Sequence, residues 1–369
     1  MRILLIGEYS NVHATLAKGL RTLGHEVTVV SNGDFWKGYP RDIDVARPEG
    51  CLGGLRLLLK VWSLLPRLRG YDVVQLINPI FFELKADRLL PLYRYLRRNN
   101  RHMVLCAMGM DYYWVSECTF SKPLRYSDFN IGPNVRTDAP AVKEQREWLG
   151  TSKEHLNKMI ASDCDGIAAG LYEDYVCYEP HFKEKTHFIP LPIDIPSVSA
   201  SIRPFSDTSQ KLRIFIGISK GRSQYKGTDV MLRAAEDAIK KHPDKAIIMK
   251  AEGVPFEQYK KMMDGADVIL DQLYSYTPSM NPLLAMSKGI ICVGGGEPEN
   301  YDILGEHELR PIINVEPNYE SVYQQLEQLI QHPERIPELK RQSIEYVKRH
   351  HDHLKIARQY EALYQSLQE

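Results

Sequence analysis

The chain has 369 residues, of which 43% are hydrophobic and 25% charged, and its 47 basic and 47 acidic side chains cancel. This composition is typical of a soluble globular protein of about two domains, and the neutral net charge excludes the global signature of a nucleic-acid-binding protein. No apolar run approaches the ~18 residues that span a bilayer. The first residues lack the pattern of a signal peptide, and the six cysteines form no CxxC pair, so we expect a cytoplasmic protein with reduced thiols.

The first half of the chain alternates between strand and helix patterns. RILLIG at 2–7 is a short apolar run that ends in glycine, which is typical of a buried parallel strand. A helix is expected over 13–23, followed by a strand at HEVTVV. Further strands are expected at 73–77, 103–108, 166–169 and 186–189. The short loop after the first strand lies where open α/β sheets place their ligands.

The same pattern begins again at residue 212. LRIFIG predicts a strand, and the expected helix and strands that follow it are 228–241, 246–250, 268–270 and 290–293. The fold class is therefore α/β, with two doubly wound, Rossmann-like domains that face a cleft. We expect an N-terminal domain at 1–195, a Ser- and Pro-rich linker at 196–211, a C-terminal domain at 212–348 and a final helix at 349–369.

The strongest local motif runs from Tyr276 to Glu299. Ser279 or Asn281 can cap a helix that begins near Pro282, and the N-terminus of such a helix can hold a phosphate. A glycine triplet follows the next strand, and its N–H groups can bind an anion as well (Gly294, Gly295 and Gly296). An ordinary capped helix and a glycine turn are the alternative.

A second motif is the loop between the strand at 212–217 and the helix at 228–241. Three cations, Lys220, Arg222 and Lys226, lie beside a strand end and a helix N-terminus. Such a group can stabilise the charge of a leaving diphosphate, although a solvated basic loop would have the same composition.

These motifs resemble the retaining, family-4 glycosyltransferases of the GT-B fold. AMSKGIICVGGGEPE matches the family pattern at Ala285, Met286, Gly289, Gly295, Gly296, Pro298 and Glu299. Upstream, Gly217 and the segment from Lys226 to Ala234 match a second family motif. The Gly7 loop, GHEVTV, Asp72-Val-Val and Gly109-Met-Asp111 match first-half landmarks that are common to nucleotide-binding α/β folds.

The chain departs from the family at three positions. The two family glutamates that lie eight positions apart fall on Tyr276 and Leu284, and the family histidine falls on Met108. Tyrosine still offers a hydroxyl, whereas leucine accepts no hydrogen bond from a ribose. Glu299, together with Glu297, is a candidate replacement that contacts the donor sugar or ribose. The alternative is that these acids only complement a helix dipole.

The resemblance implies a glycosyltransferase that moves a sugar from a UDP- or GDP-linked donor to a glycan or lipid-linked acceptor with retention, as in cell-wall or polysaccharide biosynthesis. Catalysis would use Lys226, Arg222, Lys220 and Glu299, and the donor would contact Tyr276, Ser279, Asn281, Glu297 and the glycine triplet. The acceptor would contact Gly7, Tyr9, Asn11, His13 and Asp111. Neither a cofactor nor a metal is expected. The alternatives are a catalytically weak binding protein of the same fold and a nucleotide-sugar epimerase.

One segment of the first half is strongly basic. Residues 51–101 carry ten basic and three acidic side chains. Arg56, Lys60, Ser63 and Arg67 lie within ~60° of one another on a helical wheel, and Pro66 is expected to end or kink that helix. Such a helix can dock on an anionic membrane at its inner face. The solvated face of a core helix is the alternative.

Overall fold

The computed structural model describes residues 1–195, 205, 210–218, 221 and 223–368. Most of the expected linker at 196–211 lies outside the described residues. The chain divides into two compact units. Unit 1 consists of Met1–Pro123, Lys143–Pro192 and His353–Glu369, and unit 2 consists of Leu124–Val142 and Ile193–Asp352.

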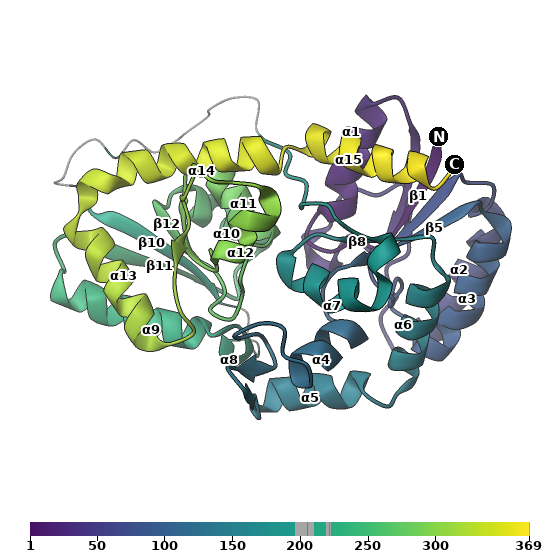
Figure 1. Cartoon of the computed structure of the whole chain (residues 1–369), viewed down its shortest axis with the longest axis horizontal. Helices are drawn as coiled ribbons and strands as arrows, with labels where there is room; N and C mark the ends of the chain where they lie inside the picture. Colours follow the sequence, from purple (N-terminus) through teal and green to yellow (C-terminus); the bar gives the residue numbers. More distant parts are fainter. Residues whose placement is uncertain (196–204, 206–209, 219–220, 222, 369) are drawn as a thin grey trace. The chain divides into compact units, whose positions relative to one another are not determined.

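Unit 1 is built on a parallel sheet with strands in the order β3-β2-β1-β4-β5-β8-β9 (Figure 1). The strands are β1 (Arg2–Ile6), β2 (Glu26–Ser31), β3 (Ile43–Asp44), β4 (Val73–Leu76), β5 (His102–Ala107), β8 (Gly166–Ala169) and β9 (Thr186–Phe188). Residues 3–6 of β1 are fully buried, because strands β2 and β4 pair with β1 on either side and helices cover the sheet. The strand order reverses between β1 and β4, which is the switch point of a doubly wound sheet.

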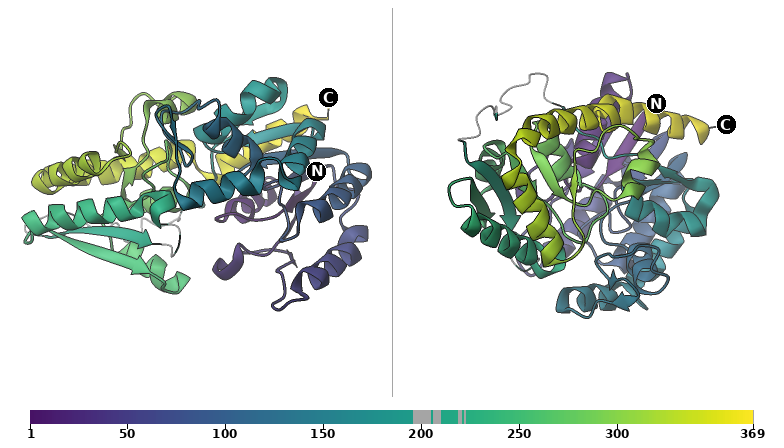
Figure 2. Two further views of the ribbon diagram at one scale, coloured as in Figure 1. Left: turned by 90° about the horizontal axis from the view of Figure 1, so that it is seen from below. Right: turned by 60° about the vertical axis from the view of Figure 1, so that its left-hand side comes forward.

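The helices of unit 1 pack around this sheet (Figures 1 and 2). They are α1 (Val12–Thr22), α2 (Gly53–Leu64), α3 (Ala86–Asn99), α4 (Tyr112–Thr119), α6 (Ser152–Asp163), α7 (Tyr172–Phe182) and α15 (His353–Ser366). Helix α5 (Ala139–Trp148) begins among the residues of unit 2 and ends among those of unit 1. Helix α15 packs directly on α1, where a Cβ added at Gly19 would lie 2.7 Å from the Cβ of Ala357.

Unit 2 has a five-stranded parallel sheet in the order β11-β10-β12-β13-β14, with its own switch point between β10 and β12. The strands are β10 (Leu212–Ile218), β11 (Ala246–Glu252), β12 (Val268–Leu270), β13 (Ile291–Gly294) and β14 (Ile313–Asn314). The helices are α8 (Ser223–Lys226), α9 (Thr228–Lys241), α10 (Phe256–Asp264), α11 (Met280–Ser287), α12 (Pro298–Leu304), α13 (Tyr319–Gln331) and α14 (Ile336–His350). A two-stranded ribbon, β6 (Asn130–Ile131) with β7 (Asn134–Val135), also belongs to this unit.

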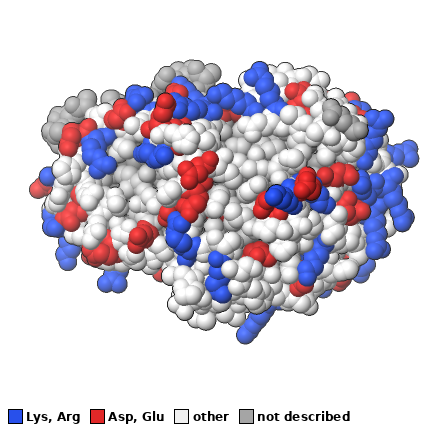
Figure 3. All heavy atoms as spheres, in the orientation of Figure 1, with Lys and Arg blue, Asp and Glu red and all other residues white. Residues whose placement is uncertain are grey.

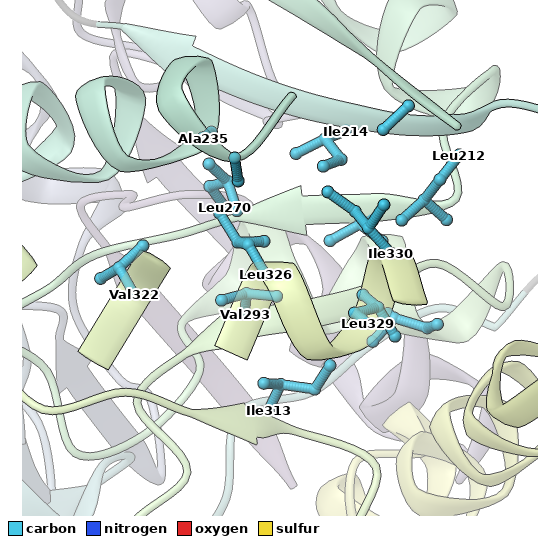
Figure 4. Close-up of a cluster of buried hydrophobic side chains, with 14 of the residues drawn as sticks. Leu212, Ile214, Ala235, Leu270, Val293, Ile313, Val322, Leu326, Leu329 and Ile330 are labelled. Carbon is cyan, nitrogen blue, oxygen red and sulfur yellow. The ribbon is translucent and has the colours of Figure 1, made fainter. Parts of the chain in front are cut away.

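The core of unit 2 lies between its sheet and the helices α9 and α13. Leu270 and Val293 from the sheet meet Leu326 of α13 in one cluster of buried side chains (Figure 4). Burying such side chains stabilises the fold by about 1.5–3 kcal/mol each relative to leaving them exposed. The expected fold class is confirmed, because both units are α/β with doubly wound parallel sheets.

Candidate functional site

The loops that follow β10 and β12 meet at the carboxyl edge of the sheet in unit 2. The backbone N–H of Leu273 donates to the carbonyl of Lys226 at 2.9 Å. Gly227 has a φ of +70°, and a Cβ added there would lie 2.5 Å from the Cβ of Leu273. Glycine is therefore required after Lys226, both for the backbone angle and for the close approach of the two loops. This arrangement places Lys226 at the switch point, where doubly wound sheets bind their ligands.

The glycine loop after β13 closes against the same loop after β12. A Cβ added at Gly295 would lie 2.0 Å from the carbonyl oxygen of Ser275, which leaves no room for any other residue. The N–H of Glu297 donates to the carbonyl of Tyr276 at 3.1 Å. Three loops from neighbouring strands thus converge, and they bring Lys226, Tyr276 and Glu297 to one edge of the sheet.

A cluster of charged and aromatic side chains lies on this edge, and Arg125 is at its centre. The Arg125 guanidinium donates to a Glu297 carboxylate oxygen at 2.6 Å and also pairs with Glu299. It lies 4.9 Å from the centre of the Tyr276 ring, and the Arg125 backbone N–H donates to the Tyr276 hydroxyl at 2.6 Å. Tyr126 donates its hydroxyl proton to Glu297 and packs its ring against Tyr276.

The electrostatics of the cluster follow from these contacts. Burial raises the pKa of Tyr276 to about 12, so its phenol stays protonated at neutral pH. The hydrogen bond from Arg125 lowers the pKa of Glu299, which stays ionised. Because the Arg125 side chain is 56% exposed, these ion pairs contribute about 1 kcal/mol or less to stability. Their main effect is to fix the position of two carboxylates.

A second arginine attaches the same chain segment to the loop after β10. The Arg136 guanidinium lies 3.9 Å from the centre of the Tyr274 ring and donates to the carbonyl of Gln224 at 3.2 Å. Asp138 balances its charge through a contact of 2.8 Å. Residues 124–142 are therefore part of the candidate site of unit 2, although they come from the first half of the sequence.

The other residues that the sequence predicts to contact the nucleotide-sugar lie at the N-terminus of α11 or outside the described residues. Ser279 occupies the N-cap position of α11, but its side chain makes no capping bond. Asn281 lies inside the helix and donates to the Tyr259 hydroxyl at 2.8 Å. Lys220 and Arg222 lie outside the described residues. Sequence reasoning missed Arg125 and Tyr126, because no local pattern marks residues whose partners lie some 170 positions away.

In unit 1, the loop between β1 and α1 is tightly folded. Gly7, Ser10 and Asn11 have φ values of +86°, +53° and +75°, and left-handed backbone is strained for the last two. The Ser10 N–H donates to Asp34 at 2.8 Å, which holds this conformation. The Asn11 side-chain oxygen is buried and has no hydrogen-bond partner in the described chain. A buried acceptor without a donor is unusual in a protein alone.

Glu8 and His13 support this loop from inside the unit. The Glu8 carboxylate accepts hydrogen bonds from the N–H groups of His13 and Ala14 at 3.3 and 2.8 Å. The His13 ring lies 2.8 Å from the Gly7 carbonyl through Nδ1 and 3.2 Å from the Gln75 amide nitrogen through Nε2. Burial lowers the pKa of His13 to about 4, so the ring is neutral. Both ring nitrogens of His13 thus contact groups of unit 1.

Asp111 follows β5 at the same carboxyl edge. It caps α4 by accepting the Trp114 N–H at 2.9 Å, and it accepts the Tyr178 hydroxyl at 2.6 Å. Burial raises the pKa of Asp111 to about 6. A Cβ added at Gly109 would lie 3.1 Å from the Tyr9 ring, so Tyr9 packs on this second loop. The expected residues Gly7, Tyr9, Asn11 and Asp111 therefore lie on neighbouring loops of unit 1.

Among the residues that the structure describes, no group of three or more His, Cys, Asp or Glu side chains is arranged to hold a metal ion. None of the helices in those residues is both long enough and apolar enough to cross a bilayer.

The arrangement of strands and helices is similar to that of solved glycosyltransferases. Sucrose-phosphate synthase from Thermosynechococcus elongatus matches with a TM-score of 0.62 at 13% identity, over 100% of this chain and 99% of that one. The catalytic domain of starch synthase IV from Arabidopsis thaliana, bound to ADP and acarbose, matches with a TM-score of 0.61 at 11% identity, over 100% and 99%. HepE from Anabaena, in complex with UDP and glucose, matches with a TM-score of 0.59 at 13% identity, over 99% of each chain.

No protein-family model and no curated protein sequence matches the chain. At such low identity, the structural likeness establishes the fold alone. The fold is GT-B, with two Rossmann-like domains.

Proposed function

We propose that the protein is a glycosyltransferase that moves a sugar from a nucleoside-diphosphate donor to a carbohydrate or lipid-linked acceptor, with retention of anomeric configuration. The observation that carries this proposal is the convergence of three loops at the switch point of unit 2. They bring Lys226, the Gly294–Gly296 loop and an acidic pair to one edge of a GT-B sheet. Retention rests on the resemblance to family 4.

In this proposal, unit 2 binds the donor. The ammonium group of Lys226 and the N–H of Gly295 bind the diphosphate, and the N-terminus of α11 adds a favourable dipole. The Gly296 N–H is already bonded, because it donates to the Asn314 side-chain oxygen at 2.9 Å. When the bond between the sugar C1 and the phosphate oxygen breaks, negative charge accumulates on the diphosphate. Groups that are held in place before the reaction stabilise that charge most effectively. Lys220 and Arg222 are further candidates for this role.

The acidic cluster binds the donor sugar or ribose in this proposal. Glu299 and Glu297 offer carboxylate oxygens held in place by Arg125, and hydroxyl groups of a sugar are matching donors. Tyr276 adds a protonated phenol. The three side chains together replace the acceptors that the family places at positions 276 and 284.

The acceptor binds to unit 1 in this proposal. The Asn11 side-chain oxygen has no donor in the described chain, so an acceptor hydroxyl can supply one. Tyr9 offers an aromatic face beside it, while Gly7 and Asp111 shape the two loops. We assign His13 a positioning role, because its ring nitrogens contact Gly7 and Gln75.

The first test is a thermal-shift panel of UDP, GDP and ADP, with and without their common sugars and Mg²⁺. A ligand at a hundredfold excess over its Kd stabilises the native state by about 2.7 kcal/mol, which raises Tm by ~5–10 °C in a domain of this size. We expect one nucleotide to act selectively and without metal. Lys226→Ala should abolish the shift, whereas Lys240→Ala, in the last turn of α9, should keep it. If no nucleotide shifts Tm, the binding-protein alternative replaces the transferase.

Product analysis then identifies the reaction. Transfer to an added acceptor supports the proposal, whereas an altered free sugar or nucleotide-sugar in the absence of any acceptor indicates an epimerase. Glu299→Gln keeps the shape of the side chain but removes its charge, so it should weaken donor binding and turnover. Unchanged affinity and turnover in Glu299→Gln would show that the carboxylate only pairs with Arg125.

A further inference from the structure

Helix α2 of unit 1 is apolar on two sides, but the described protein covers only one of them. Leu57 and Val61 are buried against the unit, and Leu65 continues this inner side into η2 (Leu65–Arg67). On the opposite side, Leu55, Leu59 and Trp62 are 54%, 62% and 50% exposed, and Leu52 at the N-cap is 53% exposed. A surface helix of a globular protein normally has one apolar stripe, which faces the core, so a second apolar stripe in solvent is unusual.

The exposed leucines and the tryptophan form one stripe. Positions 52, 55, 59 and 62 fall within about 80° of one another at 100° per residue. Ten large hydrophobic side chains are well exposed in the described chain, and four of them lie together on this side of α2. A clustered apolar surface of this kind marks an interaction site more often than scattered residues do.

Cations border this stripe on one side. Arg56 and Lys60 of α2 are exposed and lie beside the stripe, and Arg67 of η2 is exposed as well. Residues 50–71 contain no Asp or Glu. Helix α3 extends the positive surface, because the Tyr95 hydroxyl donates to the Leu65 carbonyl at 3.2 Å and so ties α3 to the end of α2. Lys and Arg side chains gather over α2 and α3 at the right-hand edge in Figure 3.

We propose that α2 docks unit 1 on an anionic lipid surface, with Leu52, Leu55, Leu59 and Trp62 inserted among the acyl chains and the bordering cations on the headgroups. The apolar side chains match the acyl-chain region of such a surface, and the neighbouring cations match its anionic headgroups. A second copy of the chain is a poorer occupant, because a two-fold interface would bring the same cations face to face. This inference goes beyond the proposed function and stands whether or not the protein transfers a sugar.

The test is co-sedimentation of the full chain with vesicles of phosphatidylcholine alone and with ~30% phosphatidylglycerol. We expect binding to the anionic vesicles only, weakened by salt. Leu55→Ser with Leu59→Ser should weaken it on the order of tenfold or more, because two inserted side chains are lost. Arg56→Gln with Lys60→Gln should weaken it ~30-fold, at about one kcal/mol per cation.

Matched controls distinguish binding through the α2 stripe from nonspecific hydrophobic binding and from an effect of total charge. Phe120→Ser removes an aromatic side chain of unit 1 that is 65% exposed and lies outside the stripe, and it should bind as the wild type does. Lys240→Gln with Lys261→Gln removes the same charge from unit 2 and should also leave binding unchanged. The fluorescence of Trp62 measures insertion directly. Its emission should shift to the blue on anionic vesicles, and the shift should be lost or reduced in Trp62→Phe.

Four results would overturn the proposal: no binding by the wild type, equal binding to neutral vesicles, equal binding by the α2 variants, or weakening by the controls as well. A wild-type dimer that Leu55→Ser with Leu59→Ser converts to a monomer, without vesicle binding, would show that a second copy covers the stripe. All substituted residues are exposed, so unchanged Tm values should confirm that the variants are folded.

Discussion

The buried carboxyl of Glu8 should make the stability of unit 1 depend on pH. Glu8 is 2% exposed, and burial raises its pKa from the ordinary 4.5 to about 8, although hydrogen bonds from the N–H groups of Ala14 and His13 oppose this. The folded chain therefore binds a proton at this site across a pH range in which the unfolded chain does not. The contribution of Glu8 to the free energy of unfolding is therefore fully present below pH ~4.5 and is lost as the pH rises to about 8.

The size of the effect follows from the two pKa values. At 1.36 kcal/mol per pH unit, a difference between 4.5 and about 8 is worth on the order of 4–5 kcal/mol. Glu8→Gln keeps the side-chain shape and carries no charge at any pH. The loss of stability due to Glu8 above pH 6.5 can be measured without interference from His13. Burial lowers the pKa of His13 to about 4, so this ring destabilises the fold only below pH 6.5.

The assay is thermal unfolding of the wild type and Glu8→Gln between pH 6.5 and 9. Between pH 6.5 and 9, the free energy of unfolding of Glu8→Gln should rise by ~2 kcal/mol relative to that of the wild type. This corresponds to roughly 4–8 °C in Tm. Comparing the two proteins cancels the titration of all other groups. If the difference in Tm is constant with pH, Glu8 is ionised throughout and its two N–H partners at the start of α1 outweigh the cost of its burial.

Two further predictions concern unit 2. Lys340→Met should destabilise the protein by about 3–5 kcal/mol, because Asp267 would stay buried without the cation that now lies 2.7 Å away. Equilibrium denaturation measures the free energy of unfolding, and a loss under about 1 kcal/mol would contradict the prediction. Gly295→Ala should disrupt the candidate donor loop and remove nucleotide-induced shifts in Tm, because its Cβ would strike the Ser275 carbonyl. Gly294→Ala, whose Cβ would lie 3.3 Å from the nearest side-chain atom, should be milder, and equal effects would refute this account.

The repeating secondary structure could be predicted from sequence because it depends on local patterns. Helix α9 (Thr228–Lys241) and strands β8 and β12 have the bounds that apolar periodicity and end signals predict. Strands β5 and β13 differ from the predicted ranges by one residue at each end, which is expected where a terminal residue belongs equally to strand and loop.

The composition of the candidate site could be predicted only in part. The positions of Lys226 and Gly295 follow from strand-loop-helix patterns, which are local. The contribution of Arg125 could not be predicted, because its partners Glu297 and Glu299 lie more than 170 positions away and salt bridges leave no periodic signal. The cations of α2 could be predicted from sequence. Which of its apolar sides is exposed could not, since that depends on what packs against the helix.

The contact between α15 and α1 also sets an order for synthesis. Unit 1 receives its last helix only after residues 193–352 have been made, which takes about 10–30 s at ordinary translation rates. Until then, the surface of α1 around Gly19 stays open, and Gln75 lacks the hydroxyl of Tyr364 that donates to it at 2.7 Å. A ribosome that stalls before residue 353 therefore holds a unit 1 whose α1 surface around Gly19 is uncovered, and exposed apolar surface of this kind makes nascent chains prone to aggregation.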